Sequence, residues 1–205
     1  RWRQSEESKK YKVNRKLIKV DISNKLDDLI NDSSFYALVQ EQHALEGKII
    51  ELRKILSDGE PTIIFVHHVE GIVEEIKERL TYYGYSVGAF YGSDKSGLKP
   101  FLVKENQILI ASMSAIGTGF DGLQNHCSRA IFFALPWTYE MKKQCEARIA
   151  RTGQNNDCEI ITLEAFYEVN NPKIKTKDNI WSWDKEVAKL IHSKREMSDL
   201  VVDGE

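Results

Sequence analysis

Two arginines three residues apart, Arg148 and Arg151, stand in the segment QCEARIARTGQ, residues 144–154. Arginine suits phosphate, because its planar guanidinium donates paired hydrogen bonds and keeps its charge. If the segment is helical, Gln144 lies four and seven residues before the arginines, so all three side chains share one face. By itself the pattern is more typical of an ordinary solvated surface, and a phosphate-binding face is the other interpretation that it allows.

An apolar stripe beside the arginines predicts how they are positioned. Met141, Cys145 and Ile149 recur every four residues, and Gly153 follows as a helix stop. This spacing predicts one helix over residues 138–153 whose apolar stripe packs on a sheet. The arginine face would then look across the ends of the strands.

Short apolar runs alternate with helical patterns along the chain. Such runs are typical of strands buried on both faces, and the alternation predicts an α/β fold, a three-layer sandwich with a central, mostly parallel sheet. Ligand sites in such folds lie at the carboxyl ends of the strands. The predicted strands are residues 62–66, 85–90, 107–111, 129–135 and 159–163, and a predicted helix covers residues 69–84.

The two ends of the chain differ from this central pattern. Residues 16–23 alternate like a strand, residues 33–59 have the pattern of one or two helices, and residues 182–201 that of a terminal helix. We therefore expect a crossover or linker segment with a basic leader over residues 1–44, a central lobe over residues 45–168, and a C-terminal loop and helix that packs back on the lobe over residues 169–205.

Charge is unevenly distributed. The 205 residues carry a net charge of −2, which does not indicate a protein that binds nucleic acid through bulk charge. Residues 1–20 hold eight basic and two acidic side chains, a local charge of +6. This leader is either a solvated segment or a patch that meets phosphate.

The cysteines and the apolar runs restrict the compartment. Three cysteines without CxxC spacing indicate reduced thiols, no run is long enough to span a membrane, and no secretory signal is present. We expect a cytoplasmic location, in a bacterial or viral context, or a nuclear one, rather than secretion. Because the chain starts at Arg1, we also expect it to be part of a longer protein.

A second candidate site follows the predicted strand at residues 107–111. The loop ASMSAIGTGFDGLQ, residues 111–124, is rich in small residues, and its glycines allow close approach of a ligand to the backbone. The candidate residues of this loop are Ser112, Ser114, Gly117, Thr118, Gly119 and Asp121.

These strings resemble the motifs of the second RecA-like lobe of superfamily-two helicases and translocases, and most closely those of the Swi/Snf-type subgroup. QCEARIARTGQ resembles motif VI, ASMSAIGTGFDGLQ motif V, PTIIFVHH motif IV, and FYGS the segment around motif IVa. Trp137 also matches the subgroup, which usually has a tryptophan shortly before motif VI. The resemblance covers about residues 45–165, and residues 17–39 are similar to the crossover into the lobe.

The sequence departs from the family pattern at three places. Ala147 stands where the family usually has Gly, Asp121 replaces a common Asn, and residues 93–101 lack the Arg usually seen after motif IVa. The last departure affects the contacts of that turn rather than the class of protein.

The resemblance implies a role for each candidate residue. Arg148 and Arg151 would be catalytic arginine fingers that reach the γ-phosphate of ATP, and Gln144 would help to set the contact between lobes. Asp121 and Gly119 would face the nucleotide. The residues expected to meet the nucleic-acid backbone are Ser112, Ser114, Gly117 and Thr118, with the backbone of Gly119.

What the chain lacks is part of the prediction. It contains no GxxxxGK[ST] phosphate loop and no acidic metal-binding box. ATP and Mg²⁺ would therefore be held mainly by an N-terminal RecA-like lobe of the same parent chain, and the present segment alone would bind ATP weakly and hydrolyse none. The expected partners are that lobe and nucleic acid, double-stranded DNA in particular, with no membrane.

Two other classes of function remain open at this stage. One is a non-catalytic nucleic-acid-binding or protein-binding domain that retains the RecA-like fold. The other is a small-molecule transferase with a nucleotide-sugar-type α/β domain, which would need a second ligand-binding half and leaves the arginine segment unexplained.

Smaller constellations have alternative interpretations. His67 and His68 lack the further ligands of a metal site, so we expect no metal. Trp181 and Trp183 either stack on bases or pin the terminal helix to the core, and we expect the second. A thiol-based site made of His126, Cys127 and Asp121 would require the fold to bring them together.

Overall fold

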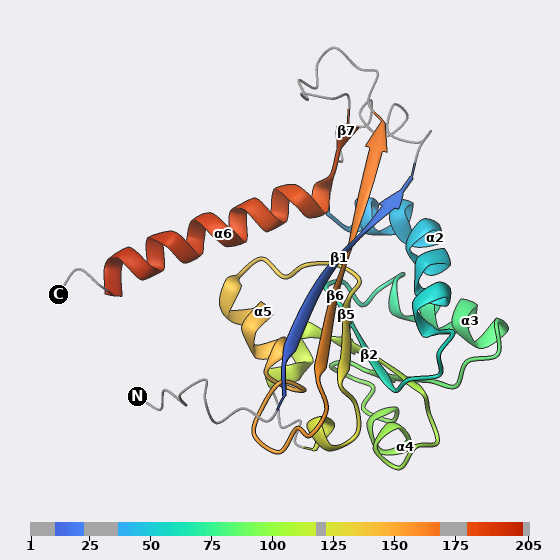
Figure 1. Ribbon diagram of the computed structural model, residues 1–205. Coiled ribbons are helices and arrows are strands. Elements are labelled where there is room, and N and C mark those ends of the chain that lie inside the picture. The colour runs from blue at the N-terminus through green and yellow to red at the C-terminus, as the bar shows by residue number, and fades with distance from the viewer. Residues whose placement is uncertain (1–10, 23–36, 118–121, 169–179, 203–205) are drawn as a thin grey trace.

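The strands form one sheet in the order β1-β6-β5-β2-β4-β3, and β7 pairs with β6 away from this path. A computed structural model of the chain describes residues 11–22, 37–117, 122–168 and 180–202 (Figure 1). The strands are β1 (Val13–Asp21), β2 (Thr62–Val66), β3 (Val87–Phe90), β4 (Ile108–Ser112), β5 (Arg129–Phe132), β6 (Cys158–Glu168) and β7 (Ile180–Trp181). All pairings are parallel except that of β6 with β7.

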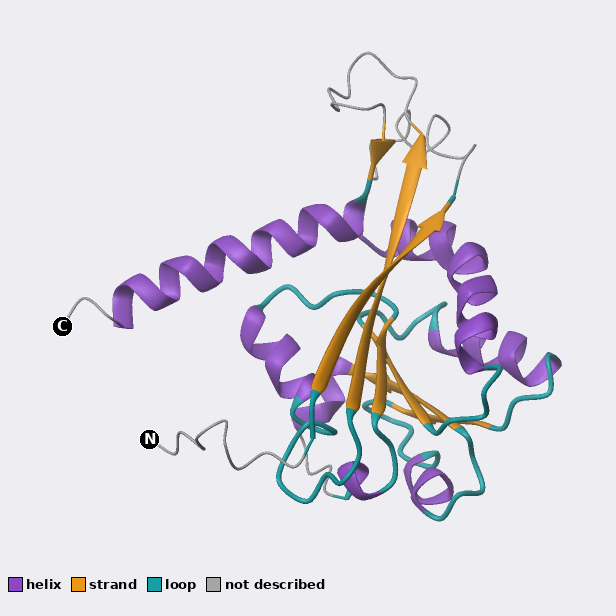
Figure 2. Ribbon diagram, in the orientation of Figure 1, coloured by secondary structure: helices purple, strands orange, loops and turns teal. Residues whose placement is uncertain are grey.

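Helices cover both faces of the sheet, as Figure 2 shows. On one face lie α2 (Ala37–Leu56) and α3 (Val73–Tyr82), and on the other lie α4 (Leu98–Leu102), α5 (Tyr139–Glu146) and the start of α6 (Trp183–Val202). The predicted three-layer α/β sandwich with a mostly parallel sheet is confirmed.

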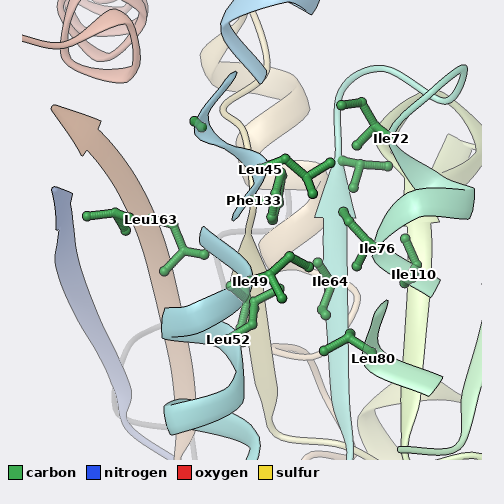
Figure 3. Close-up of a cluster of buried hydrophobic side chains, with 14 of the residues drawn as sticks. Leu45, Ile49, Leu52, Ile64, Ile72, Ile76, Leu80, Ile110, Phe133 and Leu163 are labelled. Carbon is green, nitrogen blue, oxygen red and sulfur yellow. The ribbon is translucent and has the colours of Figure 1, made fainter. Parts of the chain in front are cut away.

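The first core lies between the sheet and the helices α2 and α3 (Figure 3). Leu45, Ile49 and Leu52 of α2 recur at helical spacing, as do Ile72, Ile76 and Leu80 at α3, and each is at most 4% exposed. They meet alternate residues of the strands, because successive strand side chains point to opposite faces. The strand residues labelled in this core are Ile64, Ile110 and Leu163, and Phe133, directly after β5, joins them.

The second core lies on the opposite face and holds the predicted stripe of the arginine segment. Cys145 and Ile149 are fully buried against it, and Met141 packs on its rim. The prediction that Cys145 is a core residue is confirmed. Val187 and Ile191 of α6 join the same core, so the first part of the terminal helix packs on the lobe.

The second half of the leader is part of the sheet, as the strand β1. All nine residues of β1 pair in register with β6, from Val13 opposite Cys158 to Asp21 opposite Phe166. The helix α2 also crosses the boundary that we expected after residue 44. The strand and helix therefore extend the lobe toward the N-terminus by more than the sequence pattern indicates.

The tryptophans near the start of α6 serve packing. The Trp183 ring lies 5.7 Å from that of Trp137, and the Trp181 ring lies 6.1 Å from that of Tyr167. The prediction that they pin the terminal helix is confirmed. Over the described ranges, no helix is long and apolar enough to cross a membrane.

Candidate functional site

The arginine segment begins as the predicted helix but does not continue as one. Thr138 caps α5, because its Oγ1 accepts a hydrogen bond from the N–H of Met141 at 3.2 Å. The helix ends at Glu146, and Arg148 and Arg151 follow it in turns that lead to β6. The prediction of one helix through residue 153, with both arginines on one helical face, is wrong.

Hydrogen bonds of short span replace the helix after Glu146. The N–H of Arg148 bonds the carbonyl of Cys145 at 3.1 Å, and that of Ile149 bonds Glu146 at 3.2 Å. Bonds to the third preceding residue tighten the last turn of a helix. Because α5 runs back from the carboxyl end of β5, these turns bring Arg148 and Arg151 to the amino end of β6.

A buried glutamine holds this turn. Gln154 is 3% exposed, and its Nε2 donates to the carbonyl oxygens of Cys127 at 3.1 Å and Ile149 at 3.2 Å. Its Oε1 accepts from the N–H groups of Asn155 and Asn156 at 3.0 and 2.9 Å. A continuing helix would have offered the Ile149 carbonyl to the N–H of residue 153, so Gln154 takes the bond that the helix loses.

The turn lies against the end of the glycine-rich loop. A Cβ built on Gly153, whose φ is +96°, would be 3.6 Å from Oδ1 of Asn125 and 3.7 Å from Nε2 of Gln124. Both belong to the 3-10 turn η3 (Leu123–Asn125), which directly precedes β5. The structure therefore brings the last residues of the motif V-like string beside the motif VI-like turn, at one edge of the sheet.

The serines of the loop lie at the other end of the strands, at the carboxyl end of β4. Ser112 is 1% exposed, and its Oγ accepts a hydrogen bond from the N–H of Ala115, which lies within the 3-10 turn η2 (Met113–Gly117). Ser114 is exposed, so its hydroxyl is the more accessible of the two. Gly117 ends η2, whereas Thr118, Gly119 and Asp121 lie outside the described residues.

Gln144 and the two arginines differ in exposure. Gln144 is exposed on α5, two residues before the helix ends, and Arg148 and Arg151 are half-buried. Near them, Arg15 of β1 donates to Oε2 of the buried Glu146 at 2.7 Å. That hydrogen bond, ahead of an opposing burial effect, raises the pKa of the Arg15 guanidinium. The pair fixes the end of α5 against the edge strand.

A small open cavity of about 170 Å³ lies at the carboxyl ends of β2, β4 and β5. Within it, the indole N–H of Trp137 donates to Nε2 of His67 at 2.7 Å. Sequence reasoning singled out Trp137 and the histidines without anticipating this pair, since its members are 70 residues apart. The lining residues are His67, Met113, Ser114, Pro136, Trp137, Thr138 and Met141.

The thiol-based site is disfavoured by the environment of Cys127. Burial, together with the neighbouring Cys158, raises the pKa of its thiol to about 12. A thiol must be deprotonated to act as a nucleophile, so Cys127 is unsuited to that role at neutral pH. Burial also lowers the pKa of His126, with a smaller effect of Lys104.

The described residues include no candidate metal site. Among the residues that the structure describes, no group of three His, Cys, Asp or Glu side chains could hold a metal ion. The guanidinium groups of Arg148 and Arg151 fit phosphate oxygens, which they can meet with two hydrogen bonds each.

The comparisons with known proteins agree with this fold. No protein-family model matches the chain, and no curated protein matches it in sequence. Among solved structures, it is similar to the C-terminal part of the Fun30 ATPase domain, with a TM-score of 0.57 and 22% sequence identity. The match covers 71% of this chain and 45% of that one. The fold is therefore a RecA-like α/β sandwich, similar to that part of an ATPase domain.

Proposed function

We propose that this chain is the C-terminal motor lobe of an ATP-dependent DNA helicase or translocase of the Swi/Snf type. Arg148 and Arg151 would act as arginine fingers toward ATP held by an N-terminal RecA-like lobe. The observation that carries the proposal is the contact of the arginine turn with η3, at one edge of a RecA-like sheet. Two strings that resemble the nucleotide-facing motifs thus meet in space, although about twenty residues separate them in sequence.

The residues of this chain have limited but definite chemical tasks. Phosphoryl transfer spreads negative charge over the phosphate oxygens, and a positioned guanidinium stabilises that charge. ATP with Mg²⁺ supplies the transferable phosphoryl group. Arg148 and Arg151 would bind its oxygens, Gln144 would contact the other lobe, and Asp121 and Gly119 would face the nucleotide.

The nucleic-acid track would lie at the other edge of the sheet. Ser114 is exposed beside the cavity at the carboxyl ends of the strands, and Gly117 and Thr118 follow it in the loop. Backbone N–H groups and hydroxyls there would contact phosphates, which position a protein on DNA without specifying sequence. The loop that follows β4 leads to η3, which precedes β5. One segment would therefore contact both the nucleic acid and the bound nucleotide.

The proposal is tested by DNA-stimulated ATP hydrolysis of the full-length protein that carries this sequence. Arg148→Lys and Arg151→Lys keep the charge but lose the guanidinium fork, and an arginine finger contributes on the order of 10³–10⁵ in rate. We expect each variant to lose most turnover while its melting temperature is unchanged. Arg53→Lys is the matched control, because Arg53 lies on α2 at the opposite face, over the Tyr83 ring.

The same experiment decides between the motor lobe and the main alternative. If both arginine variants keep wild-type turnover, the lobe acts as a nucleic-acid-binding or protein-binding domain that retains the fold. The chain by itself should bind ATP weakly and show no hydrolysis. A metal-dependent turnover of the isolated chain that disappears in Arg148→Lys would contradict the division of labour between two lobes.

A further inference from the structure

Gln154 uses its whole hydrogen-bonding capacity inside the protein. A side-chain amide offers two N–H donors and one oxygen that accepts twice. Both kinds of atom are engaged, with Cys127 and Ile149 as acceptors and Asn155 and Asn156 as donors. A buried amide that is satisfied in this way has one orientation, because any rotation breaks several bonds at once.

Two further backbone bonds hold Arg151 within the turn. The N–H of Arg151 bonds the carbonyl of Ile149 at 3.1 Å, and its carbonyl accepts from the N–H of Gln154 at 3.1 Å. Gln154 therefore bonds the turn on both sides of Arg151. Its side chain bonds the carbonyl of Ile149, and its backbone N–H bonds the carbonyl of Arg151. Between these anchors, the Cα of Arg151 has little freedom to move.

One of the bonds leads out of the turn. Cys127 is buried and lies between η3 and β5, so its carbonyl is part of a different segment of the lobe. The span from Cys127 to Gln154 is 27 residues. The position of the arginine turn is thus set by the rigid start of β5 and not by the end of α5 alone.

We infer that Gln154 is a positioning residue for Arg151, which holds the arginine turn in register with the segment that ends at Cys127. The role rests on the proposed function, because it concerns the same arginine. Displacement of a catalytic group by about 1 Å can cost about 10²-fold in rate. Loss of the clamp should therefore lower the rate of hydrolysis without a matching loss of ATP affinity.

The test uses Gln154→Glu in the full-length protein. The substitution keeps the length and an oxygen for Asn155 and Asn156, but it places a carboxylate oxygen against the carbonyls of Cys127 and Ile149. We expect kcat for DNA-stimulated hydrolysis to fall about 10- to 100-fold and KM for ATP to change by less than about threefold. The control is Gln107→Glu, which removes the bond from Gln107 Nε2 to the carbonyl of Leu56 and should leave kcat unchanged.

A double variant separates positioning from a general structural role. If Gln154 acts through Arg151, adding Gln154→Glu to Arg151→Lys should cause little further loss, because the group to be positioned is already missing. A loss in the double variant equal to the product of the two single losses would overturn the inference, as would an unchanged kcat in folded Gln154→Glu. If Gln154→Glu does not fold, Gln154→Met is measured against the same outcomes.

The two single variants also distinguish failure of this inference from failure of the proposed function. Full turnover in Arg151→Lys would overturn the finger role and the positioning role together. Loss of turnover in Arg151→Lys with full turnover in Gln154→Glu would overturn the positioning role alone.

Discussion

The ammonium of Lys48 lies 2.9 Å from Oδ2 of Asp184, and the two side chains are 1% and 8% exposed. Lys48 also donates to the carbonyl of Phe133 at 2.6 Å, and Asp184 accepts from the N–H of Ala165 at 2.8 Å. This buried pair joins α2 on one face of the sheet to α6 on the other, with the backbone after β5 and the backbone of β6 completing the bonds.

Removing one member of this pair should be costly. Asp184→Ala leaves a buried ammonium without its counter-ion, which typically costs about 3–5 kcal/mol in the free energy of unfolding. Chemical denaturation of the chain, followed by circular dichroism, measures the loss. Lys48→Met combined with Asp184→Leu should recover part of it, since the buried charge is gone while the Ala165 amide still lacks an acceptor.

An exposed pair provides the matched control for that prediction. Lys54 and Glu51 lie 2.6 Å apart on α2, with the lysine side chain 65% exposed. Lys54→Met should change the free energy of unfolding by less than about 1 kcal/mol. A cost for Asp184→Ala no larger than this would show that water reaches the Lys48 ammonium in the folded chain.

Acid should destabilise the lobe through Arg129. Its guanidinium bonds Asp58 at 2.9 Å and Glu159 at 2.7 Å. The bond from Arg129 lowers the pKa of Asp58. For Glu159, burial acts to raise the pKa, and the bonds from Lys16 and Arg129 outweigh it, so that pKa is also lowered.

The direction of this pH effect follows from the linkage between proton binding and folding. A carboxyl whose pKa is lower in the folded state stabilises the fold above its unfolded pKa and loses that contribution as the pH falls through the folded value. We expect the free energy of unfolding to decline below about pH 4. In Arg129→Met the decline from neutral pH to about pH 3 should be smaller, whereas Arg79→Met, which removes an exposed pair with Glu75, should leave the decline unchanged.

The thiols should be unreactive in the folded chain. Burial raises the pKa of Cys127 and Cys145 to about 12 and that of Cys158 to about 11, and the three cysteines are buried and free. An aromatic disulfide reagent at neutral pH should label none of them during the time in which it labels all three in denaturant. Rapid labelling of one thiol under native conditions would reveal local opening of the second core.

Strand positions were predictable because the signal is local. A β-branched run such as residues 62–66 must be buried on both faces, and β2 occupies that range. The end of α5 was not predictable from periodicity, because residues 147–150 keep a helical rotation through bonds to the third and fourth preceding residues. The side chain that holds the turn after the helix, Gln154, stands five residues beyond Ile149 and has no place in the apolar pattern.

Long-range pairings were also beyond the sequence. The strand β1 pairs with β6 across 145 residues, and no turn or spacing near Val13 indicates that partner. The sequence likewise does not show that Ser114 and Arg151 lie at opposite edges of the sheet. Whether a residue lies at the amino or the carboxyl ends of the strands depends on the direction of each connection. That direction is fixed only when the strands assemble into the sheet.

The basic leader should contribute less to DNA binding than its charge of +6 indicates. Arg15 pairs with Glu146 and Lys16 with Glu159, so part of the charge is neutralised within the lobe. Deletion of residues 1–20 would remove most of β1 and destabilise the sheet, because this strand pairs with β6 over nine residues. Deletion of residues 1–10 is the informative change, since it leaves the strand intact.

Binding of the chain to duplex DNA should be weak, independent of sequence and moderately sensitive to salt. Each neutralised phosphate contributes a slope of about −0.9 on a log–log plot of affinity against salt, and few contacts near Ser114 predict a shallow slope with a dissociation constant of about micromolar or weaker. Ser114→Ala should weaken binding about two- to tenfold, as expected for one hydrogen bond. Ser112→Ala should lower stability instead, since it removes the acceptor for the Ala115 amide. Fluorescence anisotropy over a salt series measures DNA binding by both variants, and chemical denaturation measures the stability of Ser112→Ala. Sequence-specific binding at nanomolar affinity in high salt would favour a dedicated DNA-recognition domain over a motor lobe.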